Sequence, residues 1–154
     1  MCVIIDANLA HQFFTHPPDE ELKPVLDWLT EPSQNGRLVI GGKAADELLK
    51  MGAPRRFIRA LAQAGRLRLI PKAEVEAEET IVLATELCQS DDPHIIALAR
   101  VSGARVLCSH DKALHADFKN PHLVSKPRGK IYQNATHRHL LQHSAACRRY
   151  LGEK

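Results

Sequence analysis

Four acidic residues stand where short apolar runs end or where helices are expected to begin. Asp6 follows the run "CVII", Glu47 follows "LVIGGKAAD", Asp92 precedes "PHIIALA" and Asp111 follows "RVLCSH". In open parallel sheets, residues at the carboxyl ends of the strands converge on one edge. Carboxylate oxygens are the ligands that hard cations such as Mg²⁺ and Mn²⁺ prefer. The pattern is therefore typical of a metal-dependent phosphodiesterase.

Each of these acids also has a purely structural interpretation. Asp92 and Asp111 stand at the starts of expected helices, where a carboxylate can cap backbone N–H groups. Asp6 is harder to explain in this way, because a carboxylate directly after a buried run is costly without a partner. Asp6 and Asn8, on one turn, are thus the most informative local signal.

Apolar runs alternate with amphipathic segments along the chain, which predicts strands separated by helices. The expected strands are 2–6, 37–41, 66–71, 105–109 and 130–133. The expected helices are 20–30, 44–52, 54–65, 73–87 and 93–103, with one starting at residue 112 and another at the C-terminal end. This order predicts an α/β fold with three layers, α/β/α, around a central, mostly parallel sheet.

Length and composition favour one soluble domain. The 154 residues are 44% hydrophobic and 25% charged, and no Pro/Gly-rich linker divides them, so we expect a single domain over 1–154. No apolar stretch approaches the roughly 20 residues of a membrane span. The N-terminal run is interrupted by an acid after a few residues and lacks the basic start of a signal peptide. We therefore expect a cytoplasmic protein without membrane contact.

The cysteines and histidines give weaker signals. No C-x-x-C pair occurs, which argues against a zinc site and a disulfide framework, so we expect reduced thiols at Cys2, Cys88, Cys108 and Cys147. His137, His139 and His143 crowd together, and the last two would share a helical face, as metal-binding pairs do. No Glu accompanies them, so a solvated or partner-facing helix is the preferred interpretation.

Charge is unevenly distributed. Residues 72–92 carry seven acids against one lysine, whereas residues 112–154 carry nine Lys/Arg against two acids. A further basic cluster consists of Arg55, Arg56, Arg59, Arg66 and Arg68. Basic clusters near an acidic centre suit a polyanionic substrate such as nucleic acid. The alternative is that these cations lie on solvated helix faces.

Four segments in order resemble a known family. "VIIDAN", "KAADELL", "SDDPHIIALA" and "VLCSHDKALHADF" resemble the PIN domain, a family of small metal-dependent ribonucleases, over residues 1–125. The resemblance implies catalytic and metal-binding roles for the acidic quartet Asp6, Glu47, Asp92 and Asp111, with Asn8 and Ser109 as supporting residues. It also selects Glu47 over Asp46, which helical periodicity does not separate. Residues 126–154 extend beyond the family pattern.

The chain departs from the family pattern near the fourth acid. The acid and Phe that usually close this motif come somewhat later here, as "ADF". Asp117 is therefore a candidate fifth metal ligand, and Asp91 is a candidate substitute for Asp92.

The resemblance implies hydrolysis of RNA with Mg²⁺ or Mn²⁺, leaving a 5′-phosphate and a 3′-hydroxyl. Endonucleolytic cleavage is favoured over exonucleolytic cleavage. The cations expected to hold the RNA backbone are Lys43, Arg55, Arg56, Arg59 and Lys112. The family includes toxins of toxin–antitoxin pairs, so a small antitoxin protein and a second copy of the chain are the protein partners to consider.

Two other classes remain open. A catalytically inactive PIN-like module that binds RNA or protein has the same fold, since a fold does not imply an activity. A phosphotransfer domain of the haloacid dehalogenase type also places an Asp after its first strand. That class needs a second Asp two residues later, where this chain has Asn8.

Overall fold

The computed structural model describes residues 2–10, 20–142 and 147. Five parallel strands form one sheet in the order β3-β2-β1-β4-β5. They are β1 (Cys2–Ile5), β2 (Arg37–Gly41), β3 (Leu67–Ile70), β4 (Val106–Cys108) and β5 (Lys130–Tyr132). The predicted α/β fold with a parallel central sheet is confirmed. β5 pairs with β4 and lies within the stretch that the family resemblance leaves unexplained.

The helices follow the predicted order with small shifts at their ends. They are α2 (Lys23–Thr30), α3 (Gly42–Leu49), α4 (Gly52–Gln63), α5 (Lys72–Ala84), α6 (Pro93–Ser102), α7 (Lys112–Lys119) and α8 (His139–Gln142), with short 3-10 turns η1 (Ala7–Leu9) and η2 (Ala135–His137). α6 has Pro at its first position and ends at Gly103, which has a φ of 86°. This left-handed conformation favours glycine and stops the helix.

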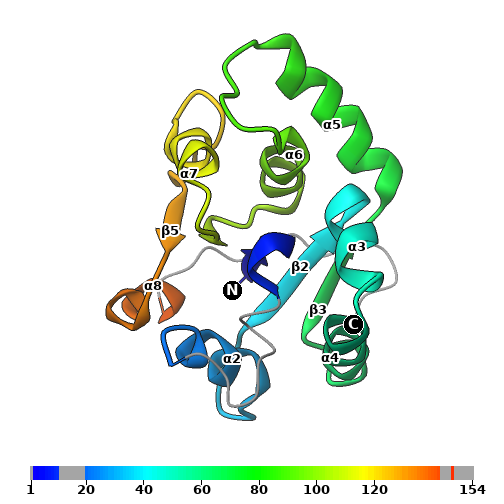
Figure 1. Cartoon of the computed structure of the whole chain (residues 1–154), viewed down its shortest axis with the longest axis vertical. Helices are drawn as coiled ribbons and strands as arrows, with labels where there is room; N and C mark the ends of the chain where they lie inside the picture. The colour runs from blue at the N-terminus through cyan, green and yellow to red at the C-terminus, as the bar shows by residue number, and fades with distance from the viewer. Residues whose placement is uncertain (1, 11–19, 143–146, 148–154) are drawn as a thin grey trace.

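Helices cover both faces of the sheet because successive strand residues point to opposite sides. Cys2 and Ile4 face a core shared with α5, α6 and α7, whereas Val3 and Ile5 face a core shared with α2 and α4. Figure 1 shows the first group of helices in the upper half of the view and α2, α4 and α8 in the lower half. Because helices cover both faces of the sheet, a site has to lie at the ends of the strands.

The strand order creates a crevice between β1 and β4. The chain runs from β1 through β2 to β3 on one side, and then crosses back to β4 and β5 on the other side. In such doubly wound sheets the connections leave the carboxyl ends in opposite directions, and ligands bind at that switch point. Asp6 directly follows β1 and Ser109 directly follows β4, so both stand at this crevice.

The edge strand β3 alternates between its two faces. Arg68 is 5% exposed and Ile70 is buried in the core shared with α5, α6 and α7, whereas Leu69 is 56% exposed. In this strand an arginine is therefore buried and a leucine faces solvent.

One cysteine expectation is wrong. Cys2 and Cys147 form a disulfide, with Cα atoms 5.7 Å apart, whereas Cys88 and Cys108 remain free thiols. The two bonded residues are separated by 145 positions in the sequence, so no local spacing could reveal the pair. The bond ties β1 to a residue near the end of the chain.

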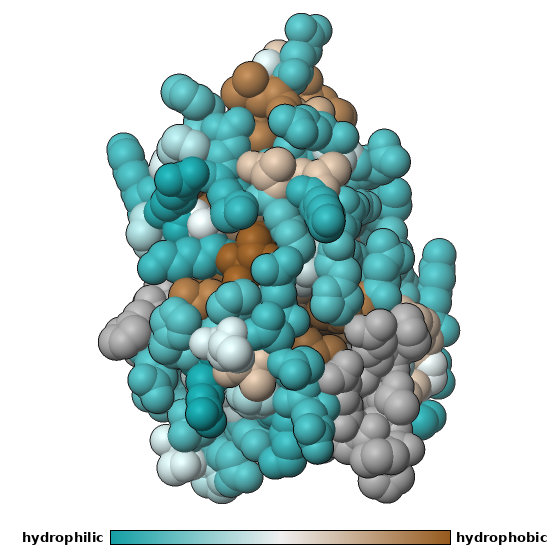
Figure 2. Space-filling view, turned by 60° about the vertical axis from the view of Figure 1, so that its left-hand side comes forward, coloured by the Kyte–Doolittle hydropathy of each residue, from teal (hydrophilic) through white to brown (hydrophobic). Residues whose placement is uncertain are grey.

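The surface is mostly hydrophilic on the face shown in Figure 2, with apolar patches near the top of the view. The exposed apolar side chains of α5 and of the residues after it are Ile81, Leu83 and Leu87. Among the described residues, no helix is long and apolar enough to cross a membrane.

Candidate active site at the carboxyl edge of the sheet

Asp6 joins the ends of the two central strands. Its backbone N–H donates to the carbonyl of Cys108 at 2.9 Å, and its side chain is nearly buried. One carboxylate oxygen accepts from the Asn8 backbone N–H at 3.3 Å, and the other accepts from the Ser109 hydroxyl at 2.9 Å. These hydrogen bonds stabilise the buried charge of Asp6, for which the sequence alone showed no partner. Asn8 and Ser109 thus both contact Asp6.

Asp111 is the N-cap of α7. Its Oδ1 accepts from the backbone N–H groups of Ala113 and Leu114 at 3.0 and 3.2 Å. Its own N–H donates to the Ser109 hydroxyl oxygen at 3.1 Å, so Ser109 connects Asp6 with Asp111. Asp111 therefore caps a helix, as its position in the sequence predicted. The same side chain lies at the crevice between β1 and β4.

Asp92 behaves differently although it also precedes a helix. Its side chain makes no capping hydrogen bond to α6. Burial raises the pKa of this carboxyl, and the negative charges of Asp6 and Asp111 raise it further, while Lys43 opposes the shift. The charges of Asp6 and Asp111 therefore both disfavour the ionised form of Asp92. Such mutual repulsion, only partly neutralised by a lysine, is what a bound cation would relieve.

α3 contributes Lys43 and Glu47. Asp46 is exposed and pairs with Lys72 at 3.3 Å, whereas Glu47 is half-buried. The charge of Glu47 acts on the imidazole of His94. The tertiary arrangement therefore separates the two adjacent acids, because Asp46 is paired at the surface whereas the charge of Glu47 acts on the buried His94.

His94 is a site residue that sequence reasoning missed. It is 2% exposed, and its Nδ1 lies 4.0 Å from Oδ1 of Asp92. Burial lowers the pKa of this imidazole, and Lys43 acts in the same direction, against the opposing charges of Glu47 and Asp6. The available signal was a histidine inside the apolar run "PHIIALA", two positions after Asp92.

A cavity of about 230 Å³ opens beside Asp6 and Asp111. Asp6, Asn8, Leu9, His110 and Asp111 line it. In the described part of the chain, no three His, Cys, Asp or Glu side chains are grouped closely enough to hold one metal ion. Of the four predicted acids, Asp6 and Asp111 line this cavity, whereas Glu47 and Asp92 do not. The carboxylate oxygens of the two lining acids are donors that fit a hard cation.

The two additional acids lie in different environments. Asp91 is exposed, and its charge contributes to the raised pKa of Asp92. Asp117 is 1% exposed, and its two oxygens accept from the backbone N–H groups of Gln89 and Ser90 at 2.8 and 2.9 Å. Both oxygens of Asp117 are thus engaged by the loop before α6 rather than by the cavity.

The basic cluster of the sequence divides into two groups. Arg55, Arg56 and Arg59 are exposed on α4, and Lys112 is exposed at the start of α7. Arg66 instead donates to the backbone carbonyls of Trp28, Leu29, Glu31 and Gly36. Arg68 is buried within the sheet. These last two arginines stabilise the fold and are not available to a phosphate backbone.

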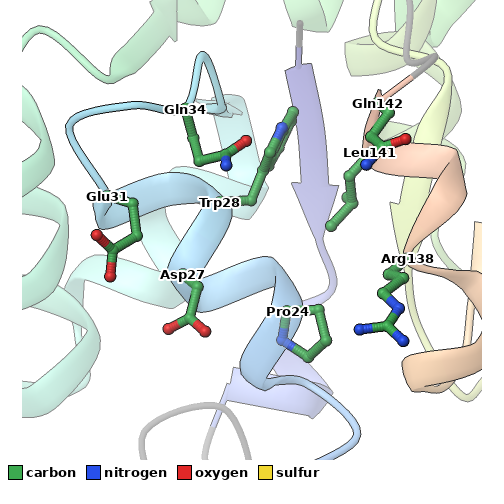
Figure 3. Close-up of a pocket in the computed structure, with 8 residues that line it drawn as sticks. All are labelled: Pro24, Asp27, Trp28, Glu31, Gln34, Arg138, Leu141 and Gln142. Carbon is green, nitrogen blue, oxygen red and sulfur yellow. The ribbon is translucent and has the colours of Figure 1, made fainter.

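A second cavity, of about 260 Å³, lies between α2 and the C-terminal segment (Figure 3). Asp27 of α2 and Glu31 directly after this helix line one side, and Arg138 and Gln142 line the other. None of the predicted acids lines this cavity.

The histidines of the C-terminal segment make local contacts. The His137 ring accepts from the Gln133 N–H at 3.0 Å, and the His139 ring lies 3.2 Å from the Thr136 carbonyl oxygen. His143, the third member of this group, lies outside the described residues. The helical face that His139 and His143 were expected to share therefore stays a prediction.

No model of a known protein family matches the sequence. A comparison with curated proteins also found no match.

Proposed function

We propose that this chain is a metal-dependent ribonuclease that cleaves RNA phosphodiester bonds internally. The observation that carries the proposal is that Asp6 and Asp111 line one cavity at the switch point, and that their charges reach Asp92 and raise its pKa. Neighbouring carboxylates at the carboxyl edge of a parallel sheet suit a cation-dependent reaction on an anionic substrate. The choice of RNA rests on the resemblance to PIN domains.

The carboxylates of Asp6, Asp92 and Asp111 would hold Mg²⁺ or Mn²⁺, with Glu47 binding the metal or orienting the attacking water. When bound, the metal supplies an activated water and stabilises charge on the phosphate. Ser109 holds the Asp6 carboxylate through its hydroxyl, and Lys43 lowers the repulsion around Asp92. Arg55, Arg56, Arg59 and Lys112 would hold the flanking phosphates, which gives affinity without reading the RNA sequence.

The partners of this proposed enzyme follow from the same resemblance. The RNA substrate is common to both biological roles, a toxin of a toxin–antitoxin pair and a housekeeping nuclease. A toxin would also bind a small antitoxin protein, and either form could pair with a second copy. A short reading frame beside the gene would favour the toxin role. Both roles place the protein in the cytoplasm.

Cleavage of a circular single-stranded RNA tests the proposal directly, because only an endonuclease cuts a substrate without ends. We expect cleavage by the purified protein with Mn²⁺ or Mg²⁺ and none with EDTA. The products should carry a 5′-phosphate and a 3′-hydroxyl. RNA binding without any cleavage would instead favour the inactive PIN-like module.

Asp6→Asn should reduce cleavage to the level of the EDTA control, because it removes one of the converging carboxylates. It should also abolish the rise in melting temperature that Mn²⁺ gives to the parent through binding linkage. Circular dichroism should show an intact fold. The matched control is Asp46→Asn, which changes an exposed acid paired with Lys72 and should keep activity. Full activity of Asp6→Asn at saturating metal would exclude the assignment.

A further inference from the structure

Asp117 is one of two buried acids in the described part of the chain, and both of its carboxylate oxygens accept hydrogen bonds. It belongs to α7, is 1% exposed and accepts two backbone hydrogen bonds, from Gln89 at 2.8 Å and from Ser90 at 2.9 Å. A buried carboxylate is costly unless such charge-assisted bonds compensate it. The bonds span 28 and 27 positions of sequence, so they fasten a distant loop to α7.

That loop carries Asp92. It follows α5 and ends where α6 begins, and the Asp92 N–H donates to the Ser90 hydroxyl oxygen at 3.3 Å. A continuous path of hydrogen bonds therefore leads from the Asp117 carboxylate through Ser90 to the backbone of Asp92. Asp92 itself has no capping bond to α6 that would hold its side chain in place.

The same helix also carries Asp111. α7 begins with this residue as its N-cap and buries Asp117 less than two turns later. One rigid element thus positions one site carboxylate directly and a second through the loop. The hydrogen bonds through Ser90 and Asp117 tie the backbone of Asp92 to the helix that carries Asp111.

We propose that Asp117 is a positioning residue that fixes Asp92 relative to Asp111 and is not itself a metal ligand. This inference rests on the proposed metal-dependent function. Residues that orient metal ligands through hydrogen bonds typically change metal affinity by about 10- to 100-fold when they are substituted. Asp117 has the burial and the geometry for that role.

The test uses Asp117→Asn, because an amide of the same shape keeps one acceptor oxygen and faces the second N–H with a donor. We expect Mn²⁺ binding, measured by isothermal titration calorimetry, to weaken about 10-fold or more. Amide hydrogen exchange over residues 86–92 should rise in the metal-free variant. Ser90→Ala removes only the acceptor of the Asp92 N–H, and it should weaken binding in the same direction by a smaller factor.

Val25→Ala is the control for a general loss of stability. Val25 is fully buried on α2, on the opposite face of the sheet from α7. This variant should melt at a lower temperature and bind Mn²⁺ as the parent does. If Val25→Ala weakened Mn²⁺ binding as much as Asp117→Asn, the positioning role would be rejected.

The outcomes separate this inference from the proposed function. Unchanged Mn²⁺ affinity in Asp117→Asn would overturn the positioning role alone. Weakened affinity in Asp117→Asn with unchanged affinity in Ser90→Ala would also overturn it, because Asp117 would then act without the loop. If Asp117→Asn does not fold, Ser90→Ala decides by the same criterion. A parent protein that binds no Mn²⁺ would reject the proposed function and this inference together.

Discussion

Asp92 and Asp111 occupy equivalent places at the starts of two helices, yet their side chains are used differently. The Asp111 carboxylate accepts two backbone N–H groups of α7, whereas the Asp92 carboxylate caps nothing. A carboxylate that caps a helix stabilises the fold, typically by about 1 kcal/mol. The Asp92 carboxylate is partly buried and lies near two other acids, but it makes no capping hydrogen bonds that would stabilise its charge. At the scale of single residues, Asp92 is therefore the acid with the clearest functional signature.

The raised pKa of Asp92 predicts a stability change with pH. The folded protein holds the Asp92 proton more tightly than the unfolded chain, whose pKa is near 3.8. Stability from this group is therefore present below 3.8 and is lost as pH rises through the raised pKa of the folded state. Asp92→Asn removes this penalty. In EDTA at about pH 7, we expect the variant to melt at a higher temperature than the parent.

The gain should shrink as pH falls and disappear well below 3.8, where the parent carboxyl is protonated in both the folded and the unfolded state. Asp46→Asn is the control, since it replaces an exposed acid that pairs with Lys72. It should give no such gain. An Asp92→Asn variant less stable than the parent at neutral pH in EDTA would contradict the repulsion that we infer between the carboxylates.

At the scale of elements, α4 and the strand after it show why a basic cluster has to be divided. Arg55 and Arg59 lie four positions apart on α4 and are exposed on one face. Arg66 follows α4 and donates to carbonyls at the end of α2 and in the turn after it. The first pair can contact a phosphate backbone, whereas Arg66 connects two elements of the fold.

Replacing both Arg55 and Arg59 with Ala should weaken RNA binding and leave turnover at saturating RNA near that of the parent. Each phosphate contact to a single strand contributes roughly 0.7 to the slope of log affinity against log salt. The slope should therefore fall by up to about 1.4 if both arginines bind phosphates. Binding is measured in the Asp6→Asn background, in which RNA should remain uncut.

A charge-matched control replaces Lys119 and Lys130 with Ala. Lys119 ends α7 and Lys130 begins β5. Both therefore lie at the amino-terminal ends of the strands, on the opposite side from the acids. This double variant should change affinity and salt slope much less. Equal effects of the two double variants would show that net charge, and not the face of α4, attracts RNA.

At the scale of the whole molecule, the disulfide between Cys2 and Cys147 closes a loop of most of the chain. Cys2 is fully buried at the start of the central strand β1. A covalent link across a long loop restricts the unfolded chain, and the chain-entropy model assigns such links roughly 4 to 5 kcal/mol. The bond should therefore raise the free energy of unfolding of the whole sheet and not only of the segments that it joins.

Titration of the unfolded, unreduced protein should find two thiols, from Cys88 and Cys108, because the other two cysteines are bonded. Reduction should lower the melting temperature of the parent. It should have little effect on Cys147→Ser, which lacks the bond and should melt near the temperature of the reduced parent. Four titratable thiols in the oxidised parent would contradict the pairing.

The sequence by itself determined the order of the strands and helices. It also showed that the four acids of the quartet lie at strand ends or near helix starts. Strands such as "CVII" and helices such as "PHIIALA" are read from local patterns, because periodicity and capping depend on neighbouring residues. A carboxylate directly after a buried strand is likewise a local feature. That Asp6 belongs to a carboxyl edge therefore followed from a few residues and from the general geometry of parallel sheets.

Tertiary structure alone decided how these side chains are used. The engagement of Asp117 by Gln89 and Ser90, and the bond from Cys2 to Cys147, join residues far apart in the sequence. Sequence periodicity carries no information on such distances. Hydrogen bonds and charge interactions depend on separation and burial in space. For this reason the fold was readable from the chain, whereas the anchoring role of Asp117 and the uncapped state of Asp92 required the folded structure.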